Sequence, residues 1–134
     1  MPTLLILDDE EDIAQICALA GEKAGFQTKY TFDFFEFKTL IEKKEPDVIL
    51  LDIVMPKVEG MEILQWLSKI HCKSHIIIMS GYGDKYLEPA QKYAEKAGLK
   101  FAARLQKPFQ FAALREILRN IGNENDPRKK LPES

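Results

Sequence analysis

The sequence predicts an α/β domain, a (βα)5 three-layer sandwich with a doubly wound, five-stranded parallel sheet of order 2-1-3-4-5. First, five short strand-like runs alternate with five helix-like runs along the 134 residues. Second, Leu4–Leu7, Val48–Leu51 and Ile76–Met79 are wholly apolar, which is typical of strands buried on both faces of a parallel sheet. Third, strict alternation favours right-handed crossovers with helices on both faces, and five such strands most often take this order.

The strands are placed by the apolar runs and by the polar or turn residues that bound them. The second run is short, and the fifth is less apolar than the others. The predicted strands are Thr3–Leu7, Gln27–Tyr30, Asp47–Leu51, His75–Met79 and Phe101–Leu105.

The helices are placed by apolar residues at spacings of three and four. Gly25 is a natural left-handed end for the first helix, and Asp33 with Glu36 forms a D-x-x-E capping box at the start of the second. The third helix begins near Gly60 and the fourth near Asp84. The expected ends of the five helices are Gly25, about Lys44, about Ile70, Gly98 and Gly122. The expected buried faces are Ile13, Ile16, Cys17, Ala20 and Ala24 in the first helix, Phe37, Leu40 and Ile41 in the second, Ile63, Leu64 and Leu67 in the third, and Leu114, Ile117, Leu118 and Ile121 in the last.

Composition limits the class of protein. The length fits one domain, and we expect residues 1–122 to form it, with 123–134 as a polar tail or linker stub. Acidic and basic residues are interspersed at a net charge of −2, which argues against a nucleic-acid surface. No apolar stretch approaches the ~20 residues needed to cross a bilayer, and the first strand follows Met1 too closely for a signal peptide. We therefore expect a cytoplasmic protein in which Cys17 and Cys72 are reduced thiols.

Chemically active side chains follow four of the predicted strands. Asp8 and Asp9 follow the first strand, Asp52 the third, Ser80 the fourth and Lys107 the fifth. In an open parallel sheet, ligands bind outside the carboxyl ends of the strands, so these five side chains should meet at one edge. Three carboxylates there would repel one another, and a divalent cation would relieve that repulsion while the lysine holds an incoming anion.

Each of these residues alone also has an ordinary explanation. Asp8 and Asp9 could simply stabilise a helix N-terminus, Ser80 could cap a turn, and Lys107 could be a solvated surface lysine. Only their combination favours a metal and phosphate site. The segment His71–His75 resembles a metal motif, but no second cluster supplies the remaining ligands of a zinc site.

With these residues in place, the chain resembles the receiver domain of bacterial two-component response regulators, a CheY-like superfamily, from residue 3 to about 122. Each motif is short, but all occur in the right order at the right strand ends. The motifs are Ile6–Glu10, Pro46–Asp52, Met55-Pro56 with Gly60, Met79–Gly81 and Lys107–Phe109.

The resemblance implies a flavodoxin-like fold and a phosphorylation site. Asp52 would accept a phosphoryl group from a histidine kinase or a histidine phosphotransfer protein, in phosphorelay signal transduction. Mg²⁺ would be bound directly by Asp9, Asp52 and the backbone carbonyl of Val54, and Asp8 would hold a metal-bound water. The chain would assist its own phosphotransfer and dephosphorylation without being an enzyme that turns over an external metabolite.

The resemblance also implies how the signal is passed on. Ser80 and Lys107 would contact phosphoryl oxygens, the Lys107–Pro108 peptide would be cis, and the face formed by the fourth helix, fifth strand and fifth helix would change. Val54 and Tyr82 would flank the phosphoryl group, and neither positions an attacking water as a carboxylate would. The kinase, the stimulus and the downstream effector stay open, as does a homodimer.

One position departs from the family pattern. Receivers commonly carry an aromatic residue three positions before the lysine, where this chain has Arg104, and the nearest upstream aromatic is Phe101. The stretch from Gly98 to Lys107 is also about two residues longer than is usual in the family. We therefore expect the serine part of the switch to operate, while the aromatic part is in question.

Two other function classes compete with this interpretation. An aspartate-nucleophile phosphatase of the haloacid-dehalogenase type would need a second aspartate at position 54, where Val54 stands. An interaction module of the same fold would never be phosphorylated, and the complete set of Asp9, Asp52, Ser80 and Lys107 argues against it. A flavin-binding relative would need a phosphate-binding loop after the first strand, and the sequence has none.

Overall fold

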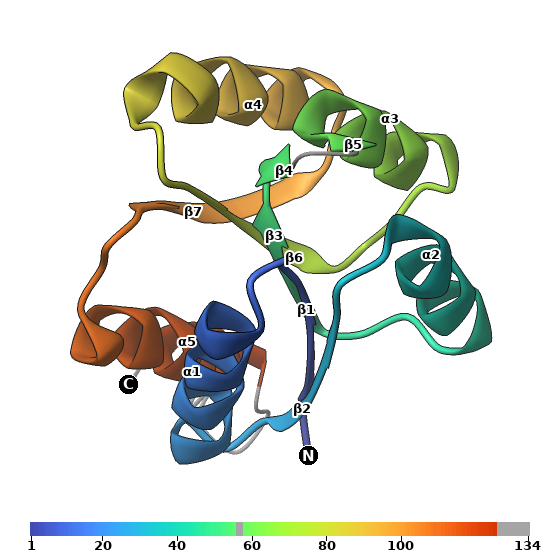
Figure 1. Ribbon diagram of the computed structural model, residues 1–134. Helices are drawn as coiled ribbons and strands as arrows, with labels where there is room; N and C mark the ends of the chain where they lie inside the picture. Colours follow the sequence, from blue (N-terminus) through green and yellow to red (C-terminus); the bar gives the residue numbers. More distant parts are fainter. Residues whose placement is uncertain (56–57, 126–134) are drawn as a thin grey trace, which may run out of the picture.

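The computed structural model describes residues 1–55 and 58–125. Its centre is a five-stranded parallel sheet of order β2-β1-β3-β6-β7, which confirms the predicted order (Figure 1). The strands differ from the predicted ranges by at most one residue at either end. They are β1 (Thr3–Leu7), β2 (Gln27–Thr31), β3 (Val48–Asp52), β6 (His75–Ser80) and β7 (Lys100–Gln106).

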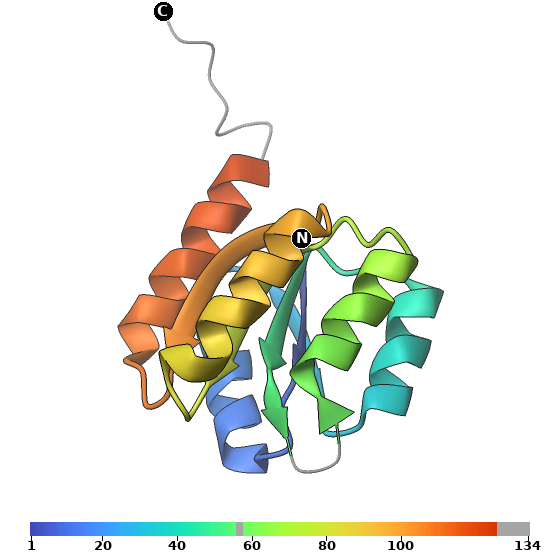
Figure 2. The ribbon, with the colours of Figure 1, turned by 90° about the horizontal axis from the view of Figure 1, so that it is seen from above.

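Helices cover both faces of the sheet, as the alternating pattern predicts. The helices α1 (Glu11–Lys23) and α5 (Phe111–Asn125) lie on one face; α2 (Phe34–Lys43), α3 (Gly60–Lys69) and α4 (Asp84–Lys96) lie on the other (Figures 1 and 2). Alternate residues of each central strand enter opposite apolar clusters because side chains of a strand point to alternating faces. Leu5 and Leu7 pack toward α2, α3 and α4, whereas Leu4 and Ile6 pack toward α1 and α5. The central strands are therefore buried on both sides.

The predicted helix ends are confirmed where a glycine adopts a left-handed conformation or a side chain caps the helix. Gly25 and Gly98 have φ values of 93° and 80°, just beyond α1 and α4. The Asp33 carboxylate accepts hydrogen bonds from the backbone N–H groups of Phe35 and Glu36, both at 3.3 Å, and so caps α2.

Two details of the predicted helices are wrong. Ile16 was expected in the core but is 46% exposed, because α1 faces the sheet with Ala14, Cys17, Ala18 and Gly21. A Cβ atom on Gly21 would lie 2.5 Å from the nearest side-chain atom of β2, so small residues allow this close approach. The last helix continues through Gly122 to Asn125, since a single glycine in a helix costs only about 1 kcal/mol. Pro56 and residues 126–134 of the predicted tail lie outside the described residues.

Two features have no counterpart in the sequence prediction. The segment after β3 forms a small antiparallel ladder between β4 (Val54–Met55) and β5 (Val58–Glu59). In β7, the pairing with β6 shifts by one residue, so that Ala102 is an extra, bulged residue. The bulge accounts for part of the unusual length before Lys107. It also turns Phe101 toward the α4 side, while Leu105 faces α1 and α5.

Among residues 1–55 and 58–125, none of the helices combines the length and apolar character that crossing a membrane requires.

Candidate functional site

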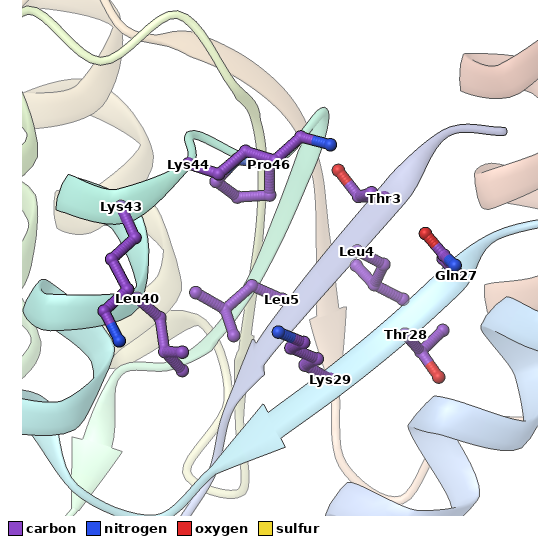
Figure 3. A pocket seen from close by; sticks show the side chains of 10 residues that line it. All are labelled: Thr3, Leu4, Leu5, Gln27, Thr28, Lys29, Leu40, Lys43, Lys44 and Pro46. Carbon is purple, nitrogen blue, oxygen red and sulfur yellow. The ribbon is translucent and has the colours of Figure 1, made fainter.

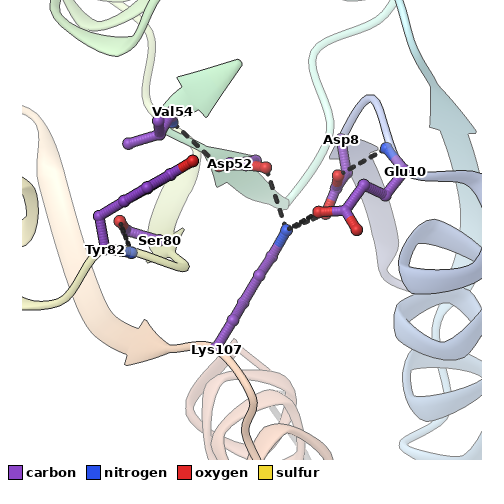
Figure 4. A network of polar contacts seen from close by, with 7 residues as sticks. All are labelled: Asp8, Glu10, Asp52, Val54, Ser80, Tyr82 and Lys107. Carbon is purple, nitrogen blue, oxygen red and sulfur yellow. Dashed lines mark hydrogen bonds and ion pairs between the residues drawn. The ribbon is translucent and has the colours of Figure 1, made fainter. Parts of the chain in front are cut away.

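The predicted site residues meet at the carboxyl-terminal edge of the sheet. Asp8 follows β1, Asp52 is the last residue of β3, Ser80 is the last residue of β6, and Lys107 follows β7 (Figure 4). Because β1 and β3 are neighbours in the sheet, the two aspartates lie side by side. Asp8 is 0% exposed and Asp52 is 3% exposed.

Lys107 joins the two buried carboxylates. Its Nζ lies 2.8 Å from Asp8 Oδ2 and 3.0 Å from Asp52 Oδ2, and 3.5 Å from Glu10 Oε1. The Lys107–Pro108 peptide is cis, and the backbone N–H of Lys107 donates to the carbonyl of Ser80 at 2.8 Å. The ammonium group is thus held at the centre of the site from the end of the edge strand.

The second oxygen of each aspartate is held by the backbone. The N–H of Val54 donates to Asp52 Oδ1 and the N–H of Glu10 donates to Asp8 Oδ1, both at 2.9 Å. Each carboxylate therefore has one oxygen on a backbone amide and the other on the lysine. Both carboxylates are fixed in orientation before any ligand arrives.

Burial and charge shift the pKa values in this cluster. Burial raises the pKa of Asp52 to about 6, although hydrogen bonds from Val54 and Lys107 oppose the shift. Burial also raises the pKa of Asp8, against the same lysine. Burial would lower the pKa of Lys107, but its bonds to the two carboxylates outweigh burial and raise that pKa above its usual value. One ammonium group thus faces two buried carboxylates, and a further cation would be favourable.

The acidic cluster fits a hard divalent cation. Carboxylate oxygens of Asp8, Asp9, Glu10 and Asp52 all lie within 4.8 Å of one another. All four groups offer oxygen, the donor that Mg²⁺ prefers, and exposed Asp9 and Glu10 leave one side open for the waters that Mg²⁺ keeps. Glu10 is a member of this cluster that was not among the predicted site residues. Its place directly after Asp9, on the same strand end, was the available signal.

Ser80 and Tyr82 border the other side of the site. Ser80 is fully buried, and its Oγ accepts a hydrogen bond from the Tyr82 backbone N–H at 3.0 Å. Tyr82 is 68% exposed, packs edge-on against Tyr86, and extends along this edge toward Asp52 and Val54 (Figure 4). Within the described residues, no hydrogen bond joins Ser80 to Asp52.

Arg104 occupies the position where the family commonly has an aromatic residue. Its guanidinium lies 3.8 Å from Asp84 Oδ1 at the start of α4, and the Arg104 and Asp84 side chains are 38% and 68% exposed. The bulge in β7 keeps Phe101 on the same side of the sheet as α4. The structure therefore brings a cation, not a ring, between β7 and the beginning of α4.

Comparisons with known proteins agree with this geometry. The family model described as "Response regulator receiver domain" matches residues 4–119. Sporulation initiation phosphotransferase F of Bacillus subtilis is 30% identical over 116 residues, covering 87% of this chain and 90% of that protein. The DNA-binding transcriptional regulator NtrC of Azospirillum brasilense is 28% identical over 97% of this chain, which spans only 26% of that longer protein.

Solved structures show the same fold. A response regulator receiver domain protein of Clostridium thermocellum superposes with a TM-score of 0.76 at 27% identity, over 92% of this chain and 96% of that one. A response regulator of Colwellia psychrerythraea gives a TM-score of 0.81 at 25% identity, over 92% and 98% of the two chains. With its acidic pocket, its lysine and its matched family model, the chain belongs to the response regulator receiver domain family.

Proposed function

We propose that this protein is a phosphorylation-dependent signalling switch that accepts a phosphoryl group on Asp52. The observation that carries the proposal is the fixed position of the Asp52 carboxylate. It is buried at the end of β3, bonded to the Val54 N–H on one oxygen and to Lys107 on the other, and next to carboxylates that are close enough together to hold a cation.

The proposed transfer needs a nucleophile, charge neutralisation and a leaving group. A carboxylate oxygen of Asp52 attacks the phosphorus of a phosphohistidine, the phosphorus–nitrogen bond breaks, and the imidazole nitrogen keeps the electron pair and takes up a proton. Asp9, Asp52 and the Val54 carbonyl would hold Mg²⁺, with Asp8 on a metal-bound water, and the bound ion would neutralise charge on the phosphoryl oxygens. Lys107, already 3.0 Å from Asp52 Oδ2, pairs with one of these oxygens.

The switch would follow from the added charge. Ser80 Oγ accepts a bond from Tyr82 N–H in this structure, so its own O–H is available to donate to a phosphoryl oxygen. A phosphoryl group on Asp52 would draw Ser80 and Lys107 toward it, and these residues end β6 and follow β7. The face formed by α4, β7 and α5 would change its packing and be read by a downstream effector.

A histidine kinase or a histidine phosphotransfer protein is the proposed phosphoryl donor. Family membership supports this, as does the B. subtilis relative, which is named a phosphotransferase and is matched over 90% of its length. We take residues 1–122 as the receiver unit. The two free, buried cysteines, Cys17 and Cys72, suit a reducing cytoplasmic location.

The mass of the intact protein after incubation with acetyl phosphate and Mg²⁺ tests the acceptor chemistry. The wild type should gain one phosphoryl group, about 80 Da, and Asp52→Asn should gain nothing. Asp47→Asn, at the opposite end of the sheet, is the matched control and should still be phosphorylated.

The two competing classes predict different results. An interaction module that is never phosphorylated would show no gain in any variant, including after incubation with phosphorylated kinase. A gain of equal size in Asp52→Asn would place the acceptor elsewhere. An aspartate-nucleophile phosphatase would release phosphate continuously from small phosphomonoesters, which Val54 in place of a second aspartate argues against.

A further inference from the structure

We propose that the outer edge of β2 is a docking site for an extended, acidic peptide segment of a partner protein. β2 is the terminal strand of the sheet and pairs only with β1; α1 and α2 lie on its two sides (Figure 1). This surface is separate from the phosphorylation site. The proposal therefore stands or falls independently of the chemistry at Asp52.

The backbone of β2 presents unpaired groups along this edge. At the two ends of the ladder, the Gln27 N–H donates to a carbonyl just before β1 (2.8 Å), and the Thr31 carbonyl accepts from the Asp8 N–H (3.2 Å). In a parallel pair, a residue that bonds its neighbour does so with both its N–H and its C=O, and the next residue turns both away. The N–H and C=O groups of Thr28 and Tyr30 therefore point outward. Within residues 1–55 and 58–125, no bond from outside the ladder reaches them.

A hollow of about 440 Å³ lies beside this edge, on the side of α2 (Figure 3). Residues of β1, β2 and the end of α2 line it. Leu5, Leu40 and Pro46 form an apolar floor, and Lys29, Lys43 and Lys44 form a basic rim. The floor accepts an apolar side chain, and the rim accepts an anionic one beside it.

The three lysines are available for a partner. In the described part of the chain, none of them forms an ion pair, and the residues lining the hollow include no carboxylate. A second hollow of about 400 Å³ continues along the strand and is bordered by Glu22 and Glu36. A partner's acidic residue therefore belongs near Lys43 and Lys44, in the first hollow, because neither glutamate is among the residues that line it.

Lys29 also selects the kind of strand that could pair here. A lysine on an edge strand discourages pairing with neutral or basic strands. A second copy of β2 would bring another Lys29 to the same edge, whereas an acidic strand would neutralise it. The surface thus suits strand addition, in which backbone bonds give affinity and alternating side chains give specificity.

The test uses short, capped synthetic peptides and the whole protein. The probe alternates glutamate and valine; one control peptide has lysine for glutamate, and another has the probe's sequence with alternate backbone nitrogens methylated. Binding is followed by fluorescence anisotropy and by NMR shifts of the Thr28 and Tyr30 amides. We expect the probe to bind and to shift both amides, and the two control peptides to do neither.

Protein variants identify the basic rim. The double variant Lys43→Glu, Lys44→Glu should bind the probe peptide about tenfold more weakly than the wild type does. Lys96→Glu is the matched control, because Lys96 ends α4 as Lys43 ends α2, and it should bind normally. Asp52→Asn should also bind normally.

Four results would overturn the proposal. Equal binding of the methylated peptide would show an anion pocket without strand pairing. Equal binding of the lysine peptide would show that the surface does not select acidic side chains. The absence of a shift at the Thr28 and Tyr30 amides would show that the peptide does not bind at the edge of β2. Self-association of the protein through β2, competing with the probe, would make a second copy the occupant.

Discussion

Replacing Asp52 by asparagine should stabilise the protein at neutral pH in the absence of Mg²⁺. Burial raises the pKa of Asp52 from 3.8 to about 6, so the folded protein holds this proton more tightly than the unfolded chain does. The free energy of unfolding therefore falls as the pH rises from about 4 to about 6, and above pH 6 it falls no further on account of Asp52. A shift of this size corresponds to about 3 kcal/mol, which sets the upper limit of the gain.

The substitution also removes one favourable interaction of the folded protein. Asparagine keeps an oxygen for the Val54 N–H, but it gives up the charged partner that Lys107 has at 3.0 Å. Lys107 retains Asp8 at 2.8 Å. The attraction between Lys107 and Asp52 opposes the rise in the pKa of Asp52, so the shift to about 6 already includes its loss. The expected gain at pH 7.5 is therefore at most about 3 kcal/mol, and near pH 4, where Asp52 is protonated, it should vanish.

Urea unfolding of the wild type and Asp52→Asn in EDTA, at pH 7.5 and at pH 4, measures both values. Adding Mg²⁺ should then stabilise the wild type more than the variant, since the ion neutralises the same repulsion. A variant that is less stable than the wild type at pH 7.5, or a gain of equal size at both pH values, would refute the claim that buried charge opposes folding here.

Three further outcomes follow from other parts of the structure. Tyr82→Ala should speed loss of phosphate from the phosphorylated protein, because Tyr82 extends toward the acceptor; an unchanged decay rate would show that Tyr82 does not shield it. Burial raises the pKa of the Cys17 thiol to about 12 and also raises that of Cys72, so neither should react with Ellman's reagent at pH 8 until urea unfolds the chain. Gly21→Ala should lower the free energy of unfolding by about 1–3 kcal/mol, because the new methyl would lie 2.5 Å from a side chain of β2. Gly122→Ala, with 3.6 Å to its nearest neighbour, should instead raise it by up to about 1 kcal/mol, and equal effects in both variants would contradict the packing argument.

The sheet and the grouping of the site residues could be predicted because both depend on local patterns. Fully apolar runs identify buried parallel strands, and topology alone brings the residues that follow them to one edge. Grouping the residues of the proposed phosphorylation site thus needed no knowledge of side-chain packing. Lys107, 99 residues from Asp8 in sequence, was placed beside it by this rule alone.

The errors concern features that depend on tertiary contacts. Ile16 has the spacing of a core residue, but the stripe of α1 that faces the sheet is set by how closely Gly21 lets the helix approach. Gly122 has the chemistry of a helix end, but it remains helical against the ring of Phe26. The unusual length before Lys107 indicated extra residues but not their position, and the structure places one of them as a bulge at Ala102.

The bulge in β7 has a mechanical consequence for α4. Phe101 packs into the same apolar cluster as Tyr93 and Ala97, near the end of α4, whereas the beginning of α4 is held to β7 by the exposed Arg104–Asp84 ion pair. An exposed ion pair contributes less than about 1 kcal/mol, while an apolar ring that is partly buried, as Phe101 is, contributes more. The two attachments of α4 therefore differ in stiffness, and the weaker one lies at the end that follows Ser80. Any tilt of α4 would begin beside the proposed phosphorylation site and turn about the aromatic contact at the far end.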